Sequence, residues 1–262
     1  TLDEFDLIER REDFGDELHE EILLITAGVD VQDDRLEYEI VGWGRGEESW
    51  SIDYNTIYGD PSSVELWHEL DKVLQQKFVH STQGEMIIRS ACIDSGGHYT
   101  QQVYNYVRPR AGKRIFAIKG IGGEGKPIAG RPTKNNIGKI NLFPVGVDTA
   151  KELVYARLKI KDEGEGYCHF PTGRHEEYFR MLTAEKRVVK YFKGRPRREW
   201  VKIRQRNEAL DCRVYATAAL SLLNVNTEVL YKQAQNRVQS GKPTPSRRPA
   251  VPRRNSFVHG YT

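Results

Sequence analysis

Ile22-Leu23-Leu24-Ile25-Thr26-Ala27-Gly28-Val29-Asp30 is a short apolar run that ends on a carboxylate. Met86-Ile87-Ile88-Arg89-Ser90-Ala91-Cys92-Ile93-Asp94 repeats this design further along the chain. Short apolar runs of this kind are typical of buried strands. A charge at the point where a strand leaves the core costs free energy unless a cation or a hydrogen-bond donor meets it. We therefore expect Asp30 and Asp94 to lie where their charges are compensated.

A third acid, Asp211, opens the apolar segment Asn207-Glu208-Ala209-Leu210-Asp211-Cys212-Arg213-Val214-Tyr215-Ala216. Its spacing predicts a helix over 207–223, with Glu208 three residues before Asp211 on the same side. If this helix packs on the sheet, a third carboxylate can reach the other two. Three carboxylates suit Mg²⁺ or Mn²⁺, and two such ions can activate water and stabilise the leaving oxygen of a phosphodiester.

Each acid also has an ordinary structural interpretation. Asp30 could be a strand-end turn residue, and Asp94 could form an Asx turn into the glycines that follow it. Asp211 could be a solvated residue in the first turn of its helix, where acids are favoured. Glu208 is better explained as a solvated or Arg-paired helix residue than as a ligand. Asp148 is better explained as the N-cap of a helix beginning at Thr149, which does not exclude a role beside the metals.

The chain has 262 residues, 38% of them hydrophobic, which is enough for one large domain with appendages. No apolar stretch approaches the roughly 20 residues of a membrane helix, and the first residues do not resemble a signal peptide. The three cysteines have no C-x-x-C spacing, so we expect them to be reduced and mostly buried in a cytosolic setting. Cys168, His169 and His175 match no usual zinc-finger spacing.

The predicted elements form an α/β fold with a mixed sheet flanked by helices. A three-stranded antiparallel meander is followed by a strand, helix and strand, the order that favours parallel pairing with a right-handed crossover. The carboxyl ends of adjacent parallel strands form a crevice where ligands bind, so Asp30 and Asp94 can be neighbours. The expected strands are 22–30, 36–44, 48–57, the one ending at 94, and 114–119, with helices at 62–78, 99–107, 149–159 and 207–223.

Charge is segregated along the chain. Residues 1–21 are an acidic lead-in, interpreted as an exposed linker from an upstream domain, and 22–223 is the predicted folded domain. Residues 224–262 form a basic tail rich in Pro and Arg, which we expect to be disordered because it cannot bury enough apolar surface.

Between Lys186 and Arg206 there are ten Lys or Arg and one acid, Glu199, with aromatic residues among them. This segment predicts a basic hairpin with strands at 186–192 and 199–203, joined by 193–198. A solvated surface would also explain the charge, but the strong bias with interleaved aromatics favours nucleic acid.

Gly120-Ile121-Gly122-Gly123-Glu124-Gly125-Lys126-Pro127 fits part of a phosphate-binding loop. Pro127 replaces the Ser or Thr that would hold Mg²⁺, and no helix is predicted after it, so we expect no nucleotide site. We interpret the segment as a flexible glycine-rich flap whose cations can contact a phosphate backbone. The candidate DNA-contacting residues of flap and hairpin are Lys126, Arg131, Lys134, Lys139, Lys193, Arg195, Arg197, Arg198, Lys202 and Arg204.

Several motifs together resemble the nuclease domain of phage large terminase subunits, and most closely the lambda-type GpA family. They recur in order from about residue 22 to 223, and their combination is specific although each is weak alone. The motifs are Gly28-Val29-Asp30-Val31-Gln32, Val41-Gly42-Trp43-Gly44, Cys92-Ile93-Asp94-Ser95-Gly96-Gly97, Ile118-Lys119-Gly120, Asp148-Thr149-Ala150-Lys151-Glu152 and Arg206-Asn207-Glu208-Ala209-Leu210-Asp211-Cys212.

This resemblance implies a ribonuclease H-like fold and cutting of concatemeric double-stranded phage DNA during packaging in the host cytoplasm. It implies that Asp30, Asp94 and Asp211 are the metal ligands, and that Asp148 and Lys151 belong to a further Asp-x-x-Lys element. Because Asp30 ends the central strand, we expect it to be the ligand that bridges two ions. The resemblance also implies an N-terminal packaging ATPase, absent from this sequence, and a small terminase subunit and the procapsid portal as partners. A junction resolvase or transposase, and a non-catalytic DNA-gripping or portal-docking module, remain alternatives.

Overall fold

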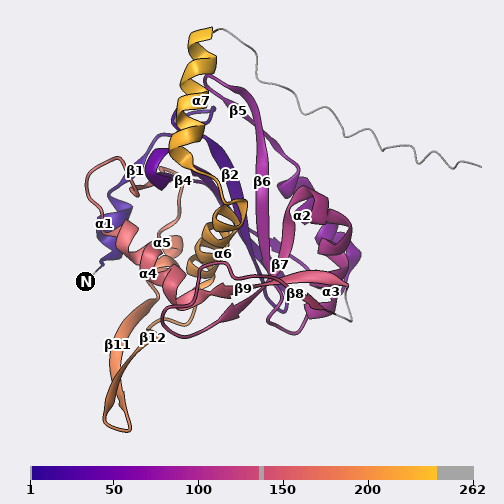
Figure 1. Cartoon of the computed structure of the whole chain (residues 1–262), viewed down its shortest axis with the longest axis vertical. Coiled ribbons are helices and arrows are strands. Elements are labelled where there is room, and N and C mark those ends of the chain that lie inside the picture. Colours follow the sequence, from indigo (N-terminus) through magenta and orange to yellow (C-terminus); the bar gives the residue numbers. More distant parts are fainter. Residues whose placement is uncertain (1, 136–138, 241–262) are drawn as a thin grey trace, which may run out of the picture.

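The fold is a mixed β-sheet between two layers of helices, seen in a computed structural model that describes residues 2–135 and 139–240 (Figure 1). Within those residues, ten strands form the sheet in the order β1-β10-β4-β3-β2-β6-β7-β9-β8, and β5 pairs with β6. The strands are β1 Arg11–Glu12, β2 Leu24–Val31, β3 Arg35–Trp43, β4 Ser49–Tyr58, β5 Lys77–His80, β6 Gly84–Asp94, β7 Ile115–Ile121, β8 Thr133–Asn135, β9 Ile140–Gly146 and β10 Cys168–Pro171.

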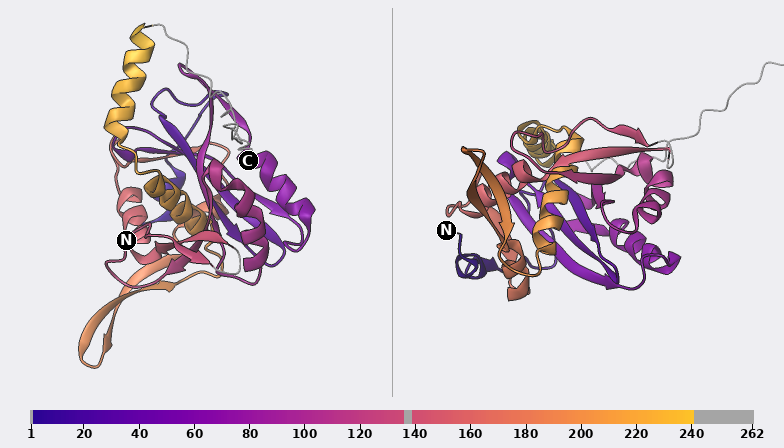
Figure 2. Two further views of the ribbon diagram at one scale, coloured as in Figure 1. Left: turned by 45° about the vertical axis from the view of Figure 1, so that its right-hand side comes forward. Right: turned by 90° about the horizontal axis from the view of Figure 1, so that it is seen from below.

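Helices cover both faces of this sheet, and a separate hairpin projects from the body (Figures 1 and 2). The helices are α1 Glu4–Ile8, α2 Val64–Leu74, α3 Thr100–Val107, α4 Val147–Leu158, α5 Glu176–Leu182, α6 Glu208–Leu223 and α7 Thr227–Ser240, with short 3₁₀ turns η1 Arg45–Glu47 and η2 Arg108–Lys113. The hairpin consists of β11 Glu185–Phe192 and β12 Arg195–Lys202.

The predicted pairing of the central strands is confirmed. Strands β2, β3 and β4 form the antiparallel meander, and β2 pairs in parallel with β6, which pairs in parallel with β7. β2 is therefore the point where the sheet changes from antiparallel to parallel. Successive side chains along these strands point to opposite faces of the sheet and therefore enter two different hydrophobic cores. Ile25, Ala27 and Val29 pack with α2 and α3, whereas Cys92 and Ile118 pack under α4, α5 and α6.

Helix α6 lies unusually close to β2 because Gly28 has no side chain. A Cβ atom at Gly28 would stand 2.0 Å from the carbonyl oxygen of Cys212 and 2.5 Å from the amide nitrogen of Ala216. A buried ion pair also joins this helix to β3. The Arg213 guanidinium donates to both carboxylate oxygens of Glu39, at 3.1 and 2.7 Å. Together these contacts fix the depth and rotation of α6 above the sheet.

Several elements differ from the sequence-based expectations. Helix α2 ends at Leu74, and β5 occupies residues predicted as the end of that helix. β9 and α5 were not predicted. In the hairpin, Lys193 and Gly194 alone form the turn, both with positive φ (49° and 75°), so β12 begins at Arg195 rather than at 199. Two consecutive residues with positive φ are the mark of a type I′ turn, which suits the twist of a two-stranded ribbon.

Two expectations for the ends of the chain are wrong. The lead-in is not an exposed linker, because Leu7 is fully buried and β1 pairs with β10. The segment expected to be disordered begins with a helix, α7, up to Ser240; residues 241–262 lie outside the described residues. Leu230 of α7 packs against the core, and Glu228 pairs with Arg45 at 2.7 Å.

All three cysteines are free and buried, as expected. His169 is stacked on Trp50 and lies between the carboxylates of Glu12 and Glu48, at 2.7 and 2.8 Å. These contacts give His169 a structural role. In the part of the chain that the structure describes, no helix is long and apolar enough to cross a membrane.

Candidate metal centre and nucleic-acid interface

Asp30 and Asp94 stand at the same end of two neighbouring parallel strands. Gly28 pairs with Cys92 and Val29 with Ile93, so continuing the register sets Asp30 beside Asp94. By the alternation along their strands, both residues lie on the face of the sheet that α6 covers. Asp30 is only 4% exposed, which is inconsistent with a solvated turn residue. Asp94 does form the Asx turn, because the Gly96 amide donates to its Oδ1 at 3.0 Å.

Asp211 reaches the same region from the first turn of α6. Its carboxylate raises the pKa of Asp30, and Asp94 in turn raises the pKa of Asp211. Such through-space effects require the charges to be near one another. The close contact at Gly28 explains the placement, because Cys212, the residue after Asp211, touches β2 two residues before Asp30. The structure thus brings the three predicted aspartates to one end of β2 and β6.

Burial raises the pKa of all three aspartates, and repulsion between carboxylates adds to the rise at Asp30 and Asp211. For Asp30 the rise is large, caused first by burial and then by Asp211, with a smaller contribution from Asp94 and an opposing hydrogen bond from Gln32. Burial raises the pKa of Asp211 to about 7, against the opposing charge of Lys151. Burial also raises the pKa of Asp94, while backbone amides of Gly96 and Ser95 lower it.

This donor set fits a hard divalent cation in its chemistry. Buried carboxylates that repel one another are stabilised when a cation lies between them, and Mg²⁺ and Mn²⁺ prefer such oxygen ligands. The three aspartates do not form a closed ligand set in the structure. Across residues 2–135 and 139–240, no group of three or more His, Cys, Asp or Glu side chains is arranged to hold a metal ion.

Hydrogen bonds occupy one oxygen of each aspartate. Gln32 Nε2 donates to Asp30 Oδ2 at 2.5 Å, and Asn207 Nδ2 donates to Asp211 Oδ2 at 3.0 Å. With the Gly96 amide on Asp94, each carboxylate is held by a donor of its own. The aspartates therefore share an electrostatic environment while their orientations are set separately.

Glu208 is engaged by two arginines, as its ordinary interpretation predicts. Arg35 lies 2.9 Å from Glu208 Oε1, and Arg206 lies 3.3 Å from Oε2. Both arginines also pair with Glu37, which is fully buried on β3. The charge of Glu208 is thus compensated within the fold, although it still contributes to the raised pKa of Asp30.

Asp148 is not the N-cap of α4, because the helix begins at Val147 and its N-cap is Gly146. Its carboxylate instead accepts a hydrogen bond from the Gly123 amide in the glycine-rich segment, at 2.7 Å. Backbone hydrogen bonds between Pro127 and Gly146, and between Gly130 and Pro144, also hold this segment. The interpretation of a flexible flap is therefore not supported. Over the described residues 127–135 that follow Lys126 there is no helix, as expected.

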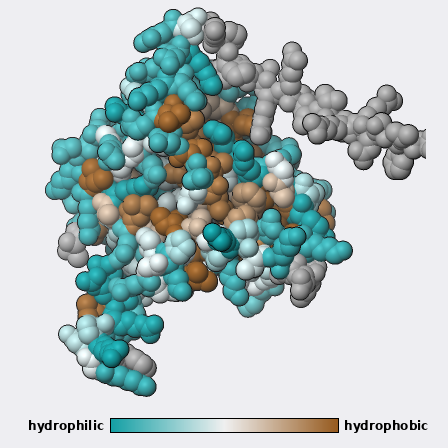
Figure 3. All heavy atoms as spheres, viewed as in Figure 1, coloured by the Kyte–Doolittle hydropathy of each residue, from teal (hydrophilic) through white to brown (hydrophobic). Residues whose placement is uncertain are grey.

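The basic hairpin forms an exposed ribbon whose surface is mainly hydrophilic (Figure 3). Arg197 and Arg198 are exposed near its middle, and Val189 and Tyr191 are exposed among the cations. The base of the hairpin and the glycine-rich segment meet at α4, where Glu124, Asp148 and Trp200 line one small pocket. Nine of the candidate cations are exposed in the structure: Lys126, Arg131, Lys134, Lys139, Lys193, Arg195, Arg197, Arg198 and Lys202.

Arg204 is the exception among these cations. It lies beyond β12, and its guanidinium donates to Glu4, Thr183 and the Arg180 carbonyl, each at 2.8 Å. These bonds hold the lead-in and α5 against the chain after the hairpin. The prediction that Arg204 contacts DNA is therefore not supported by its setting.

Sequence reasoning missed four residues around the aspartates: Gln32, Glu185, Asn207 and Tyr215. Burial raises the pKa of Tyr215, and the charges of all three aspartates add to this rise. Tyr215 lies four residues after Asp211 on the same helix, and this spacing could have identified it from the sequence as a neighbour of Asp211. Glu185 interacts with Lys151, which is 34 residues away in the chain, and no local sequence pattern predicts that pairing.

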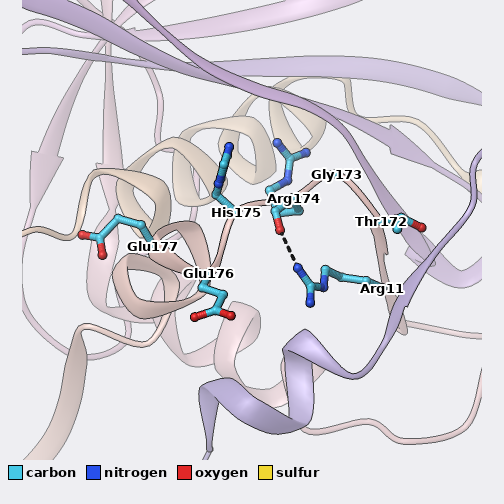
Figure 4. Close-up of a pocket in the computed structure, with 7 residues that line it drawn as sticks. All are labelled: Arg11, Thr172, Gly173, Arg174, His175, Glu176 and Glu177. Carbon is cyan, nitrogen blue, oxygen red and sulfur yellow. Dashed lines mark hydrogen bonds between the residues drawn. The ribbon is translucent and has the colours of Figure 1, made fainter.

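A hollow elsewhere on the surface includes none of the candidate carboxylates (Figure 4). Acidic and basic side chains line it, and Arg11 donates to the Arg174 carbonyl across it, at 3.1 Å. Its lining residues are Arg11, Thr172, Gly173, Arg174, His175, Glu176 and Glu177.

Comparison with known proteins gives a consistent result over most of the chain. Residues 1–233 match the family model described as terminase large subunit gpA, endonuclease domain. The chain is 36% identical over 225 residues to the terminase large subunit of Escherichia phage lambda, covering 82% of this chain and 35% of the relative. It is 37% identical over 207 residues to that of Enterobacteria phage P21, covering 76% of this chain and 32% of the relative. The chain thus spans about a third of these relatives, and no solved structure matches it.

Proposed function

The chain belongs to the terminase large subunit gpA endonuclease-domain family, and from this premise we propose that it cuts double-stranded phage DNA during genome packaging. The observation that supports the proposal is the placement of Asp30 and Asp94 at the ends of the paired strands β2 and β6, with Asp211 in the first turn of α6, which packs on β2. The mixed sheet, with its switch to parallel pairing at β2, is compatible with a ribonuclease H-like arrangement.

In this proposal Asp30, Asp94 and Asp211 are the residues that would hold Mg²⁺ or Mn²⁺. When bound, such ions supply charge neutralisation, water activation and stabilisation of the leaving oxygen. In the structure one oxygen of each carboxylate is held by a donor of its own, so the other oxygen of each would be the one left for an ion. Burial of Asp30 limits competition from water, which strengthens electrostatic interactions at the site.

The exposed cations of the hairpin and the glycine-rich segment bind the phosphate backbone in this scheme. They carry no base-reading pattern, so they position the duplex rather than select a sequence. Asp148 ties the glycine-rich segment to α4 and thus sets where its cations lie relative to the aspartates. We assign the choice of the cut site to the small terminase subunit. In this scheme the protein also docks to the procapsid portal and works with an N-terminal ATPase, all in the host cytoplasm.

Plasmid nicking in Mn²⁺ tests the function. We expect the wild-type chain to relax supercoiled plasmid and Asp30→Asn to lose this activity by at least roughly a hundredfold, because a bridging ligand is lost. Asp33→Asn is the matched control: this acid follows the same strand but is 72% exposed at its side chain and pairs with His98. It should nick as the wild type does.

Three outcomes would overturn the proposal. Absence of nicking by folded wild-type chain favours a non-catalytic DNA-gripping or portal-docking module. Equal nicking by Asp30→Asn and wild type shows that the activity does not use this site. Cleavage restricted to four-way junctions favours a resolvase.

A further inference from the structure

Glu185 is a buried carboxylate at the root of the hairpin, and no local sequence pattern singles it out. It is the first residue of β11 and is 6% exposed. Lys151 of α4 places its Nζ 2.8 Å from each of the two carboxylate oxygens. The backbone of Glu185 is also held, since its carbonyl accepts from the Tyr155 hydroxyl at 2.6 Å. Side chain and main chain of Glu185 are therefore both fixed to α4.

Asn207 connects this ion pair to the candidate metal centre. Its Nδ2 donates to Glu185 Oε1 at 2.9 Å and to Asp211 Oδ2 at 3.0 Å. An amide nitrogen carries two hydrogens, so one side chain can make both bonds at once. The result is a continuous chain of contacts, Lys151 to Glu185 to Asn207 to Asp211.

The position of Asn207 makes this connection informative. Asn207 is the N-cap residue of α6, where an Asn side chain ordinarily accepts a hydrogen bond from its own helix. Here the side chain makes no capping bond and bridges the two carboxylates instead. The start of the helix therefore lacks the stabilisation of a side-chain capping bond and has a link to Asp211 instead.

A buried ion pair is a weak source of stability, because desolvation offsets the attraction between its charges. Lys151 and Glu185 are 9% and 6% exposed, so both bear this cost. Their pairing does, however, hold Glu185 Oε1 in one place, and Asn207 binds it there. Oriented ligands generally depend on such outer contacts, whose loss weakens metal binding or activity by about 10- to 100-fold.

We infer that Glu185, fixed by Lys151, is a positioning residue that orients Asp211 through the Asn207 amide. This inference rests on the proposed function. Asn207 holds Asp211 Oδ2, so Oδ1 is the Asp211 oxygen that remains for a divalent cation. Because Glu185 also begins the hairpin, the orientation of Asp211 is tied to how the DNA-binding ribbon sits on the body.

Two variants separate positioning from folding. Asn207→Ser keeps a residue that caps helices well but is too short to bridge the carboxylates. The double variant Lys151→Met with Glu185→Leu removes both buried charges, which avoids leaving one of them unpaired. For each, we would measure the thermal unfolding midpoint, the Mn²⁺ dissociation constant by calorimetry, and kcat and KM for plasmid nicking.

We expect both variants to fold with midpoints near that of the wild type. Their Mn²⁺ dissociation constants should rise about 10- to 100-fold, and kcat should fall while KM for DNA changes little. Wild-type affinity and kcat in folded Asn207→Ser would overturn the inference while leaving the proposed function intact. If the wild-type chain itself neither binds Mn²⁺ nor nicks DNA, the proposed function fails and the inference fails with it.

Discussion

Gly28 of β2 and Cys212 of α6 meet backbone to backbone, with only 2.0 Å between a Cβ built on Gly28 and the Cys212 carbonyl oxygen. The absence of one methyl group thus sets the distance between the central strand and the helix that carries Asp211. The residues that hold the site together are therefore not limited to those with polar side chains.

Gly28→Ala should destabilise the protein by about 3 kcal/mol or more, because the added methyl group forces α6 away from the sheet. Urea unfolding followed by circular dichroism measures this loss. Gly112→Ala is the control, since a Cβ there meets nothing within 4 Å. A Gly28→Ala protein as stable as the Gly112→Ala protein would show that α6 does not depend on this contact.

The metal-free protein should become less stable as pH rises from about 5 to 8. The folded-state pKa of Asp211 is raised from 3.8 to about 7, and that of Asp30 is raised as well. Between the unfolded and folded pKa values the folded state binds more protons, so deprotonation lowers the free energy of unfolding. Each unit of pKa shift corresponds to about 1.4 kcal/mol, so the change should reach a few kcal/mol.

Thermal unfolding midpoints in a chelating buffer test this dependence. Asp211→Asn should show a flatter profile, and the comparison also subtracts the opposite contribution of His80, whose pKa burial lowers. Added Mn²⁺ should stabilise the wild type more at pH 8 than at pH 5, because protonated carboxylates do not bind metal. A metal-free midpoint that rises steadily from pH 5 to 8 would contradict the burial of these groups.

Removing hairpin cations should weaken DNA binding and its dependence on salt. Arg195→Gln with Arg197→Gln should lower the slope of log affinity against log salt by roughly 2, about one for each phosphate that is no longer neutralised. Fluorescence anisotropy with a labelled duplex measures the slope. Lys159→Gln with Lys161→Gln, two exposed cations beyond the end of α4, should leave it unchanged. Equal slopes for the two double variants would mean that the hairpin is only a solvated surface.

The central strands and α6 are predictable because their signals are local. Apolar runs ending at Asp30 and Asp94, and the i, i+4 spacing around Asp211, each depend on a few adjacent residues. Given a parallel pair, the side-chain alternation of strands then places both aspartates on one face. Local sequence signals are therefore sufficient to predict the strand ends and the helix turn on which the three acids lie.

The remaining features depend on contacts between distant segments. Lys151 and Glu185 are 34 residues apart, and Glu39 and Arg213 are 174 apart, so no window of sequence contains either pair. The hairpin turn is shorter than the predicted 193–198, because Lys193 and Gly194 alone make it and the strand pairing already includes Pro196. α7 was missed because its composition is polar, although Leu230 docks it against the core.

Crystals of the protein containing Mn²⁺, examined by anomalous scattering, test the central claim most directly. We predict a Mn²⁺ peak about 2 Å from carboxylate oxygens of Asp30, Asp94 and Asp211, the contact distance for a hard cation of this kind. Asp33→Asn should keep the peak and Asp30→Asn should lose it. A Mn²⁺ peak bound only by other residues, or none in protein that nicks DNA in the same Mn²⁺ solution, would contradict the account.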